Sequence, residues 1–178
     1  MKKMVNFCLC LVFLLGAGCG GQSKPSATAP PLSSAAYRAE GLCAFEVPDG
    51  WNIQEFPGLK HRIVAGQPSN GFAPNLNVVD ENNSMSLKDY LAGNQATLQK
   101  VMSGYTEDSA AEFSTAGGLP AYRLSYSAQQ QNRSLHLVQY LFDGKPGKKI
   151  VVTFTRLASQ DAGLDALVDG KLKSFRLE

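Results

Sequence analysis

The first 36 residues limit the part of the chain from which a core can be built. Two lysines precede residues 4–15, which are apolar apart from one Asn. As a helix, about a dozen residues rise roughly 18 Å, well short of the ~30 Å hydrocarbon core of a membrane. A positive start, a short apolar centre and three small residues at 16–18 are typical of a secretory signal. We therefore predict that residues 1–18 form a cleaved signal peptide.

Cys19 follows the three small residues directly. This segment resembles the signal of bacterial lipoproteins, in which the cysteine becomes the first mature residue and carries diacylglycerol on its sulfur. Ala17 and Gly18 fit the usual pattern, whereas Gly16 stands where Leu is usual, with Leu15 one place further back. The resemblance implies that Cys19 is the lipid-attachment residue and that acyl chains such as palmitate anchor the protein. An ordinary cleaved signal with an unmodified cysteine is the alternative.

Residues 20–36 have the composition of a linker. They contain Gly, Ser, Pro and Ala, a single Lys and one large apolar side chain. Such a segment cannot bury enough surface to offset the entropy lost on ordering. As a flexible coil, its ~17 residues span roughly 20–25 Å. We interpret residues 19–36 as the lipidated cysteine with a flexible tether, and residues 37–178 as one globular domain.

Charge and cysteine content narrow the possible functions. Without the two leader lysines, 15 of the 17 basic residues remain against 15 acidic ones. A neutral domain has no net field to hold a polyanion, so we predict no nucleic-acid partner. Once the signal is removed and Cys19 acylated, Cys43 is the one remaining thiol, which leaves no internal disulfide. We interpret Cys43 as a small apolar side chain in the core, with a reactive or intermolecular role as the alternative.

The pattern from residue 37 onwards begins with short strands. "CAFEVPDGWNIQE" (43–55) predicts two strands around a turn at Pro-Asp-Gly, and "HRIVAG" (61–66) and "NLNVVDE" (75–81) predict two more. Ser86 then opens a helix, with Asp89 placed as in a capping box and Gly104 as its end. The apolar residues on one face of this helix are Leu87, Tyr90, Leu91, Leu98, Val101 and Met102.

Hairpins and a second helix complete the chain. Residues 110–128 predict a hairpin that turns at Gly117 and Gly118, and residues 133–142 and 148–156 predict strands joined by "DGKPG". We expect Ser159 to cap a last helix. Its inward residues are Leu164, Leu167, Val168 and Leu172, and its outward stripe is Asp161, Asp165 and Asp169. The whole order predicts an α+β fold: a mainly antiparallel β-sheet sandwiched by helices.

A series of short pieces follows one another as in a known group of proteins. "FEVPDGW", "PNLNVV", "SLKDYL", "GLPAYRLSY", "LVQYLF", "VVTFT" and "SFRL" span about residues 44–176. In this order they resemble the PsbP/DcrB-like group, which includes extrinsic photosystem II proteins and many bacterial lipoproteins. The resemblance implies an antiparallel sheet sandwiched by helices. It carries no shared catalytic motif onto this chain, and fold alone does not settle function.

Residues that could carry chemistry are few. His61 and His136 are the only histidines. They are far apart in sequence and lack the accompanying ligands of a zinc site, so we predict no catalytic residues, no bound metal and no cofactor. His136 alternates with Leu135 and Leu137 and should point to the opposite face of its strand. No nucleophile elbow or phosphate-binding loop is present. A Ser-His-Asp site remains an open alternative by residue count.

Other polar and aromatic features are interpreted as ordinary surface or core residues. The aspartate stripe of the last helix predicts a solvated face. The turn lysines, which are Lys145, Lys148 and Lys149, predict a solvated loop, with contact to anionic lipid head groups as the alternative. Trp51 should anchor the core, with a partner contact as the alternative.

These observations favour a membrane-tethered, non-enzymatic protein of the bacterial envelope. We expect it to act as a protein-interaction or assembly module, held to the membrane through the lipid anchor and bound to an envelope protein. The alternative is a small-ligand or metal-binding lipoprotein with a pocket between sheet and helices. A hydrolase is a third reading. Gly20 after Cys19, in place of Asp, resembles outer-membrane sorting in organisms that have such a membrane.

Overall fold

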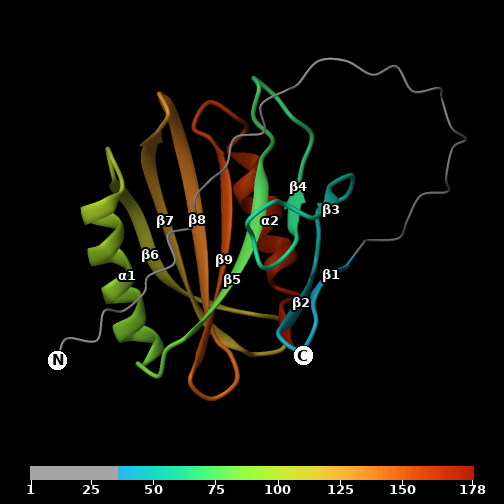
Figure 1. Ribbon diagram of the computed structural model, residues 1–178, viewed down its shortest axis with the longest axis vertical. Helices are drawn as coiled ribbons and strands as arrows, with labels where there is room; N and C mark the ends of the chain where they lie inside the picture. The colour runs from blue at the N-terminus through green and yellow to red at the C-terminus, as the bar shows by residue number, and fades with distance from the viewer. Residues whose placement is uncertain (1–35) are drawn as a thin grey trace, which may run out of the picture.

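The computed structural model describes residues 36–178. The predicted signal peptide, Cys19 and the tether up to residue 35 therefore lie outside the described residues. A large, twisted antiparallel sheet forms the centre of the molecule (Figure 1). One helix packs on each face, and a small second sheet lies beside the second helix. The predicted α+β class is confirmed. Within residues 36–178, no helix is long and apolar enough to cross a membrane.

Residues 36–178 form ten strands in two sheets. The small sheet has the order β1-β2-β10 and contains β1 (Ala36–Ala39), β2 (Cys43–Glu46) and β10 (Arg176–Leu177). The large sheet has the order β3-β4-β5-β9-β8-β7-β6, with every neighbouring pair antiparallel. Its strands are β3 (Asn52–Gln54), β4 (Ile63–Ala65), β5 (Asn75–Asn82), β6 (Thr106–Ser114), β7 (Pro120–Gln130), β8 (Arg133–Asp143) and β9 (Lys148–Leu157).

The first helix begins as the sequence predicts. In α1 (Leu87–Val101), Ser86 is the N-cap: its Oγ accepts from the Asp89 backbone N at 3.1 Å and donates to the Asp89 carboxylate at 2.7 Å. Asp89 thus replaces the Glu of a capping box. Val101 was expected on the buried face but is 51% exposed; in this last turn, Leu98 and Met102 supply the contacts with the core. Buried Asn94 occupies a place on that face instead.

The second helix differs more from its prediction. α2 (Gly163–Leu172) begins after Ser159, and no side chain caps its Ala162 N-cap. The predicted Ser159 cap is therefore wrong. Asp161 Oδ1 accepts from the Gly163 backbone N at 2.8 Å and fixes the turn before the helix. Val168 and Leu172 are buried as predicted, but Leu167 is 42% exposed because this short helix presents only a narrow stripe to the sheet.

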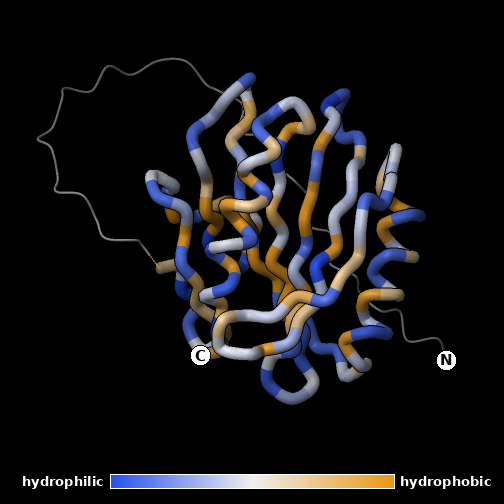
Figure 2. The backbone as a smooth tube through the Cα atoms, turned by 180° about the vertical axis from the view of Figure 1, so that it is seen from behind, coloured by the Kyte–Doolittle hydropathy of each residue, from blue (hydrophilic) through white to orange (hydrophobic). Residues whose placement is uncertain are grey.

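The two faces of the large sheet carry separate cores. Along β8, Leu135, Leu137 and Leu141 pack toward α1, while alternate residues such as Val138 and Phe142 pack toward α2 and the small sheet. This period of two is the pattern expected of a strand buried on both faces. The hydropathy-coloured backbone shows apolar residues concentrated in the central strands (Figure 2). Cys43 is fully buried in the second of these cores, and burial raises its thiol pKa to about 12, so its predicted packing role is confirmed.

The strands predicted from residues 43–55 both form, but they do not pair with each other. β2 pairs with β1 and β10, whereas β3 pairs with β4. The turn between them, closed by a hydrogen bond from Trp51 N to Pro48 O of 3.1 Å, carries the chain from the small sheet to the large one. Trp51 packs against the core with its ring 6.1 Å from that of Phe154, which confirms its predicted anchoring role.

Candidate functional site

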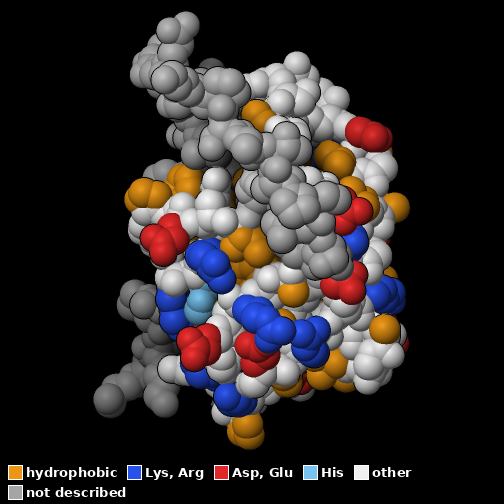
Figure 3. Space-filling model, turned by 90° about the vertical axis from the view of Figure 1, so that its right-hand side faces the viewer, with side chains coloured by type: hydrophobic (Ala, Val, Ile, Leu, Met, Phe, Trp, Pro, Cys, Tyr) orange, Lys and Arg blue, Asp and Glu red, His pale blue; other side chains and the backbone are white. Residues whose placement is uncertain are grey.

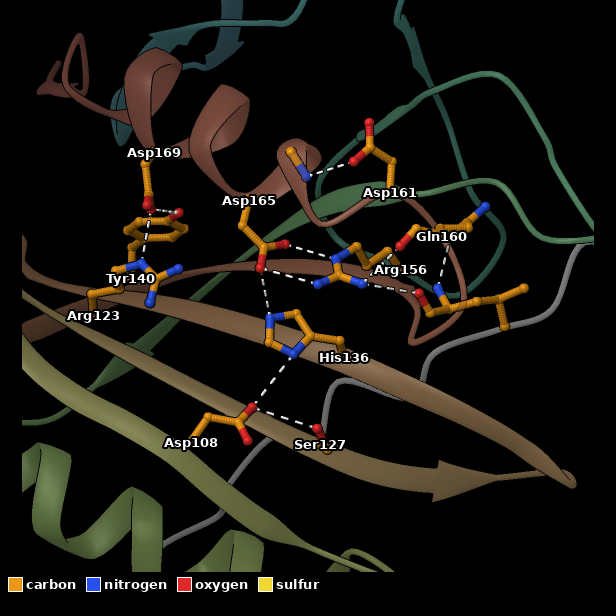
Figure 4. Close-up of polar contacts among 12 residues, drawn as sticks. Asp108, Arg123, Ser127, His136, Tyr140, Arg156, Gln160, Asp161, Asp165 and Asp169 are labelled. Atoms are coloured by element: carbon orange, nitrogen blue, oxygen red, sulfur yellow. Dashed lines mark hydrogen bonds and ion pairs between the residues drawn. The ribbon is translucent and has the colours of Figure 1, made fainter.

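A layer of charged side chains lies between α2 and the sheet (Figure 4). Arg156 of β9 binds Asp165 of α2 through two contacts, Nε to Oδ1 at 2.7 Å and Nη2 to Oδ2 at 3.1 Å. Its Nη1 also donates to the carbonyl oxygens of Leu157 and Gln160. The Arg156 side chain is 6% exposed and that of Asp165 is 20% exposed. Burial alone would raise the pKa of Asp165, but His136 and Arg156 outweigh it and hold that pKa well below its usual range.

Asp169, one turn further along α2, makes a second set of contacts. Its Oδ1 accepts from Arg123 Nε at 2.8 Å and from the Tyr140 hydroxyl. Burial first, and then this carboxylate, raise the pKa of Tyr140 far above its usual range. The predicted solvated stripe is therefore wrong for Asp165 and Asp169, because both reach basic groups on inward-facing sheet positions. Only Asp161 is exposed as predicted.

His136 lies between two carboxylates in this layer. As predicted, it points away from Leu135 and Leu137, toward α2. Nε2 is 2.9 Å from Asp165 Oδ2 as an ion-pair contact, but it has no hydrogen-bond partner among the described residues. Nδ1 is 3.4 Å from Asp108 Oδ2.

The order of these groups does not match nucleophilic catalysis. Ser127 Oγ contacts Asp108 at 3.4 Å, so the carboxylate stands between the hydroxyl and His136. In a catalytic triad the histidine stands between serine and acid, where it can accept the serine proton. Across residues 36–178 no group of three or more His, Cys, Asp and Glu side chains is arranged to hold a metal ion. The layer fastens α2 to the sheet.

The second histidine belongs to a cluster around Asp80. Asp80 Oδ1 contacts Lys60 Nζ at 2.5 Å and His61 Nε2 at 2.8 Å, and Oδ2 contacts Lys148 Nζ at 3.0 Å. The Asp80 side chain is only 5% exposed. Burial alone would raise its pKa, but contacts from these three partners hold the pKa well below the usual range.

The turn lysines do not act together. Lys149 is buried and contacts Asp143 at 2.7 Å, so the solvated-loop prediction is wrong for this residue, which lies within β9. Lys145 is exposed and donates to the Gly41 carbonyl at 3.0 Å, and Lys148 faces Asp80. Lys148 and Lys149 are adjacent in β9, so their side chains point to opposite faces of the sheet.

A row of uncharged polar side chains crosses the face of the large sheet on which α1 packs. Asn77, Thr153 and Gln139 stand opposite one another on β5, β9 and β8, and Asn94 of α1 donates to Gln139 Oε1 at 2.5 Å. All four residues are at most 7% exposed. Asn77 Oδ1 and the hydroxyls of Thr153 and nearby Thr155 have no hydrogen-bond partner among the described residues. Buried polar atoms usually have partners, so this row is a candidate place for a bound molecule or ordered water.

Within residues 36–178, no strand pairs with the outer side of β6, so the far edge of the large sheet is open. β6 is nine residues long, and every residue of it except Phe113 is exposed. A cavity of about 470 Å³ lies at its end, lined by Glu112, Phe113, Tyr122 and Lys173, with Leu87 and Lys88 from the start of α1. The chain shifts register between Glu107 and Ser109, which forms a bulge in the pairing with β7.

Sequence reasoning missed both the charged layer and the open edge. Arg123, His136 and Arg156 stand at strand positions that alternate with apolar ones facing α1. A basic side chain on an inward strand position signals a buried acidic partner, since an unpaired buried charge is costly. This signal was present in "HLVQYLF" and "VVTFTR". No local pattern could have marked β6 as the edge, because that depends on the order of strands.

Comparison with known proteins supports the fold. No protein-family model matches the chain, and no curated protein matches it. Solved structures do match the chain. LpqN of Mycobacterium tuberculosis, involved in cell envelope biogenesis, is 16% identical with a TM-score of 0.57, covering 82% of this chain and 90% of LpqN. PA94 of Pseudomonas aeruginosa, of unknown function, is 18% identical with a TM-score of 0.55, covering 77% and 92%.

A third solved structure links the fold to the resemblance seen in the sequence. The cyanobacterial PsbP protein (CyanoP) of Synechocystis is 15% identical with a TM-score of 0.57, and the match covers 92% of this chain and 99% of CyanoP. At these identities the likeness concerns the fold alone. The chain has a PsbP-like fold.

Proposed function

We propose that the protein is a lipid-anchored, non-enzymatic module of the bacterial envelope that binds an extended segment of another envelope protein along β6. The observation that carries this proposal is the long exposed edge of the large sheet. An exposed edge strand offers unpaired backbone groups to which an extended peptide can add as a further strand. The envelope role of LpqN, which shares the fold, supports the setting.

The side chains of β6 indicate what kind of segment fits. Glu107, Asp108 and Glu112 are exposed on this edge. A second copy that paired antiparallel about Ala110 would place Asp108 opposite Glu112, and like charges directly opposite each other destabilise a strand pair. The bulge at Glu107 also disfavours regular pairing between two copies. The edge therefore favours an extended partner with Lys or Arg over a second copy of this chain.

A matched pair of positions tests the proposal. A photo-crosslinking residue replaces Ala110 on β6 or, as the control, exposed Ala96 on the outer side of α1. In intact cells, we expect one discrete crosslinked product from position 110 and none from position 96. A Glu112→Lys change in the position-110 variant should reduce that product, because it reverses one charge facing the partner. Equal crosslinking from both positions, or no effect of the charge reversal, would count against β6 as the interface.

The anchor is tested separately. Cys19→Ala removes the sulfur to which the lipid would attach, so we expect the variant to remain unprocessed or to leave the membrane. Membrane fractionation and intact mass measure this. Unchanged mass and normal membrane retention would refute the lipoprotein part of the proposal and leave the β6 interface open to its own test.

A small-ligand function is the second candidate, and the unpartnered atoms of Asn77, Thr153 and Thr155 favour it. These groups are uncharged and suit a neutral, hydrogen-bonding molecule. Native mass spectrometry of protein released gently from its own membranes should then show a stoichiometric added mass. Thr153→Val with Thr155→Val should abolish that added mass without unfolding the domain, because valine fills nearly the same volume.

A further inference from the structure

Basic side chains gather at the edge of the molecule opposite β6. Five of them, called the basic edge here, surround the β3–β4 side of the large sheet and the start of the small sheet. They are Arg38, Lys60, Arg62, Lys145 and Lys148. The side view in Figure 3 shows Lys and Arg side chains gathered around a histidine, with acidic side chains between them.

Hydrogen bonds and ion pairs tie these residues into one surface. Arg62 Nη2 lies 3.4 Å from the carbonyl oxygen of Arg38, and the Tyr37 hydroxyl donates to the Arg62 carbonyl at 3.0 Å. Lys60 and Lys148 share Asp80. Lys145 reaches the turn after β1 through the Gly41 carbonyl. The basic edge therefore joins three segments that are distant in the sequence.

Two of these cations face outward while the carboxylates that pair with them lie deeper. The side chains of Lys60 and Arg38 are 68% and 58% exposed, whereas those of their partners Asp80 and Glu178 are 5% and 21% exposed. Arg62 and Lys145 are exposed, and no ion pair is found for either within residues 36–178. An approaching surface would meet four exposed cations of the basic edge, Lys148 being partly buried, against the exposed carboxylates of Glu40 and Glu55.

The loop before β4 adds apolar groups beside these cations. In "EFPGLKHR" (55–62), Phe56, Pro57 and Leu59 line a hollow of about 390 Å³ together with Glu55, Lys60 and Arg62. Pro57 and the left-handed Gly58 (φ +83°) are exposed at the tip of the loop. Apolar side chains next to basic ones are the combination that binds the interface of an anionic membrane.

The chain enters the domain at this same surface. The first described strand begins at Ala36, and Arg38 of that strand belongs to the basic edge. A lipid at Cys19 would be separated from Ala36 by only 16 intervening residues of Gly-, Ser- and Pro-rich chain. As a flexible coil, such a linker would give a typical distance of roughly 20–25 Å between the lipid and the point of entry.

We propose that the basic edge rests against an anionic membrane surface and so turns β6 away from the bilayer. This inference rests on the tether of the proposed function, and it adds an orientation that the tether alone does not supply. The large sheet then runs from a basic edge at the membrane to an acidic edge in the aqueous space. A partner with a basic extended segment would meet β6 free of the lipid.

Lysine acetylation in vesicles tests the orientation on the unaltered protein. The protein, purified from its membranes, is reconstituted into phosphatidylcholine vesicles with or without phosphatidylglycerol, and acetylation of each lysine is followed by mass spectrometry. With the anionic lipid, we expect Lys60 and Lys145 to react about fivefold more slowly. Lys88 and Lys100, exposed on α1, serve as internal controls and should not change. High salt should remove the protection.

Charge reversal separates docking from anchoring. Arg62→Glu with Lys145→Glu leaves the Asp80 cluster intact and should abolish the protection of Lys60. Lys88→Glu with Lys100→Glu makes the same change in charge on α1 and should preserve it. Equal reactivity of Lys60 in both lipids, or equal loss in both variants, would overturn the proposal. Because every sample stays bound to the vesicles, that result would leave the anchor itself untouched, whereas failure of the anchor shows as protein that does not join them.

Discussion

Replacing Asp165 by Ala removes the carboxylate that holds the Arg156 guanidinium between α2 and β9. Arg156 is 6% exposed and would keep only the carbonyl oxygens of Leu157 and Gln160 as partners. Removing one member of a buried ion pair typically costs about 3–5 kcal/mol, and the two remaining carbonyl contacts place this case near 3 kcal/mol. In a domain of this size, a loss of that order lowers the melting temperature by roughly 10 °C.

Urea unfolding of the wild type, Asp165→Ala and Asp161→Ala measures this effect. Asp161 is exposed and contributes one hydrogen bond to a backbone N, so we expect its loss to cost about 1 kcal/mol at most. Arg156→Met with Asp165→Leu should recover much of the loss, since it leaves no unpaired charge. If Asp165→Ala and Asp161→Ala cost the same, Asp165 would be a solvated surface residue and the account of the charged layer would be wrong.

The same pair predicts a dependence on pH. The pKa of Asp165 is lower in the folded chain than in the unfolded chain, so its contribution is fully present above the unfolded value of ~3.9. As the pH falls below that value toward the folded pKa, the contribution is lost. Asp165→Asn should therefore show a weaker loss of stability in this acidic window than the wild type. Identical slopes for the two proteins would refute the assignment.

Three further predictions follow from close contacts and buried groups. In Gly66→Ala, the new Cβ would lie 2.7 Å from Trp51 Cε2 and 3.1 Å from Pro74 Cγ. We therefore expect the free energy of unfolding to fall by about 1–3 kcal/mol and the tryptophan fluorescence to change. As the control, the Cβ of Gly170→Ala on α2 meets no atom within 4 Å and should not destabilise the fold. Cys43, with its thiol pKa raised to about 12, should react with a thiol reagent only on unfolding; rapid reaction of the native protein would contradict its burial. His61→Gln with His136→Gln should still complement a deletion strain at permissive temperature, and loss of a stoichiometric metal together with function would contradict the non-enzymatic, metal-free reading.

Local signals predicted local structure well. The start of α1 is decided by Ser86 and Asp89, which are three residues apart and bond to each other, so the sequence alone was sufficient there. The hairpins around Gly118 and Gly147 were also predicted, because both glycines take the positive φ angles that such turns require. The pairing of β3 with β4 instead of β2 was not predictable in this way. It depends on where the small sheet packs, which no neighbouring residue determines.

The aspartates of α2 show a second limit. Their spacing of four residues is compatible with a solvated stripe or with a charged interface, and the helix itself does not distinguish the two. Whether the aspartates are solvated or form an interface depends on Arg123, Tyr140 and Arg156. These residues lie between nine and 46 positions away from their aspartate partners in the sequence. Considering which strand positions face inward would have favoured the interface, because each of these inward-facing hydrogen-bond donors needs an acceptor.

The net charge of the domain alone does not determine which anionic partners it can bind. A chain with balanced charges has no net field, and this argument still disfavours a polyanion that wraps the whole molecule. A flat membrane surface is different, because it meets one side of the domain and is screened from the other beyond a distance of ~10 Å. What matters there is how the charges are distributed, and the strand order places Lys60 and Arg62 at one edge of the sheet and Glu107, Asp108 and Glu112 at the other. A neutral composition is therefore compatible with a domain that is oriented by an anionic surface while its acidic edge binds a basic strand.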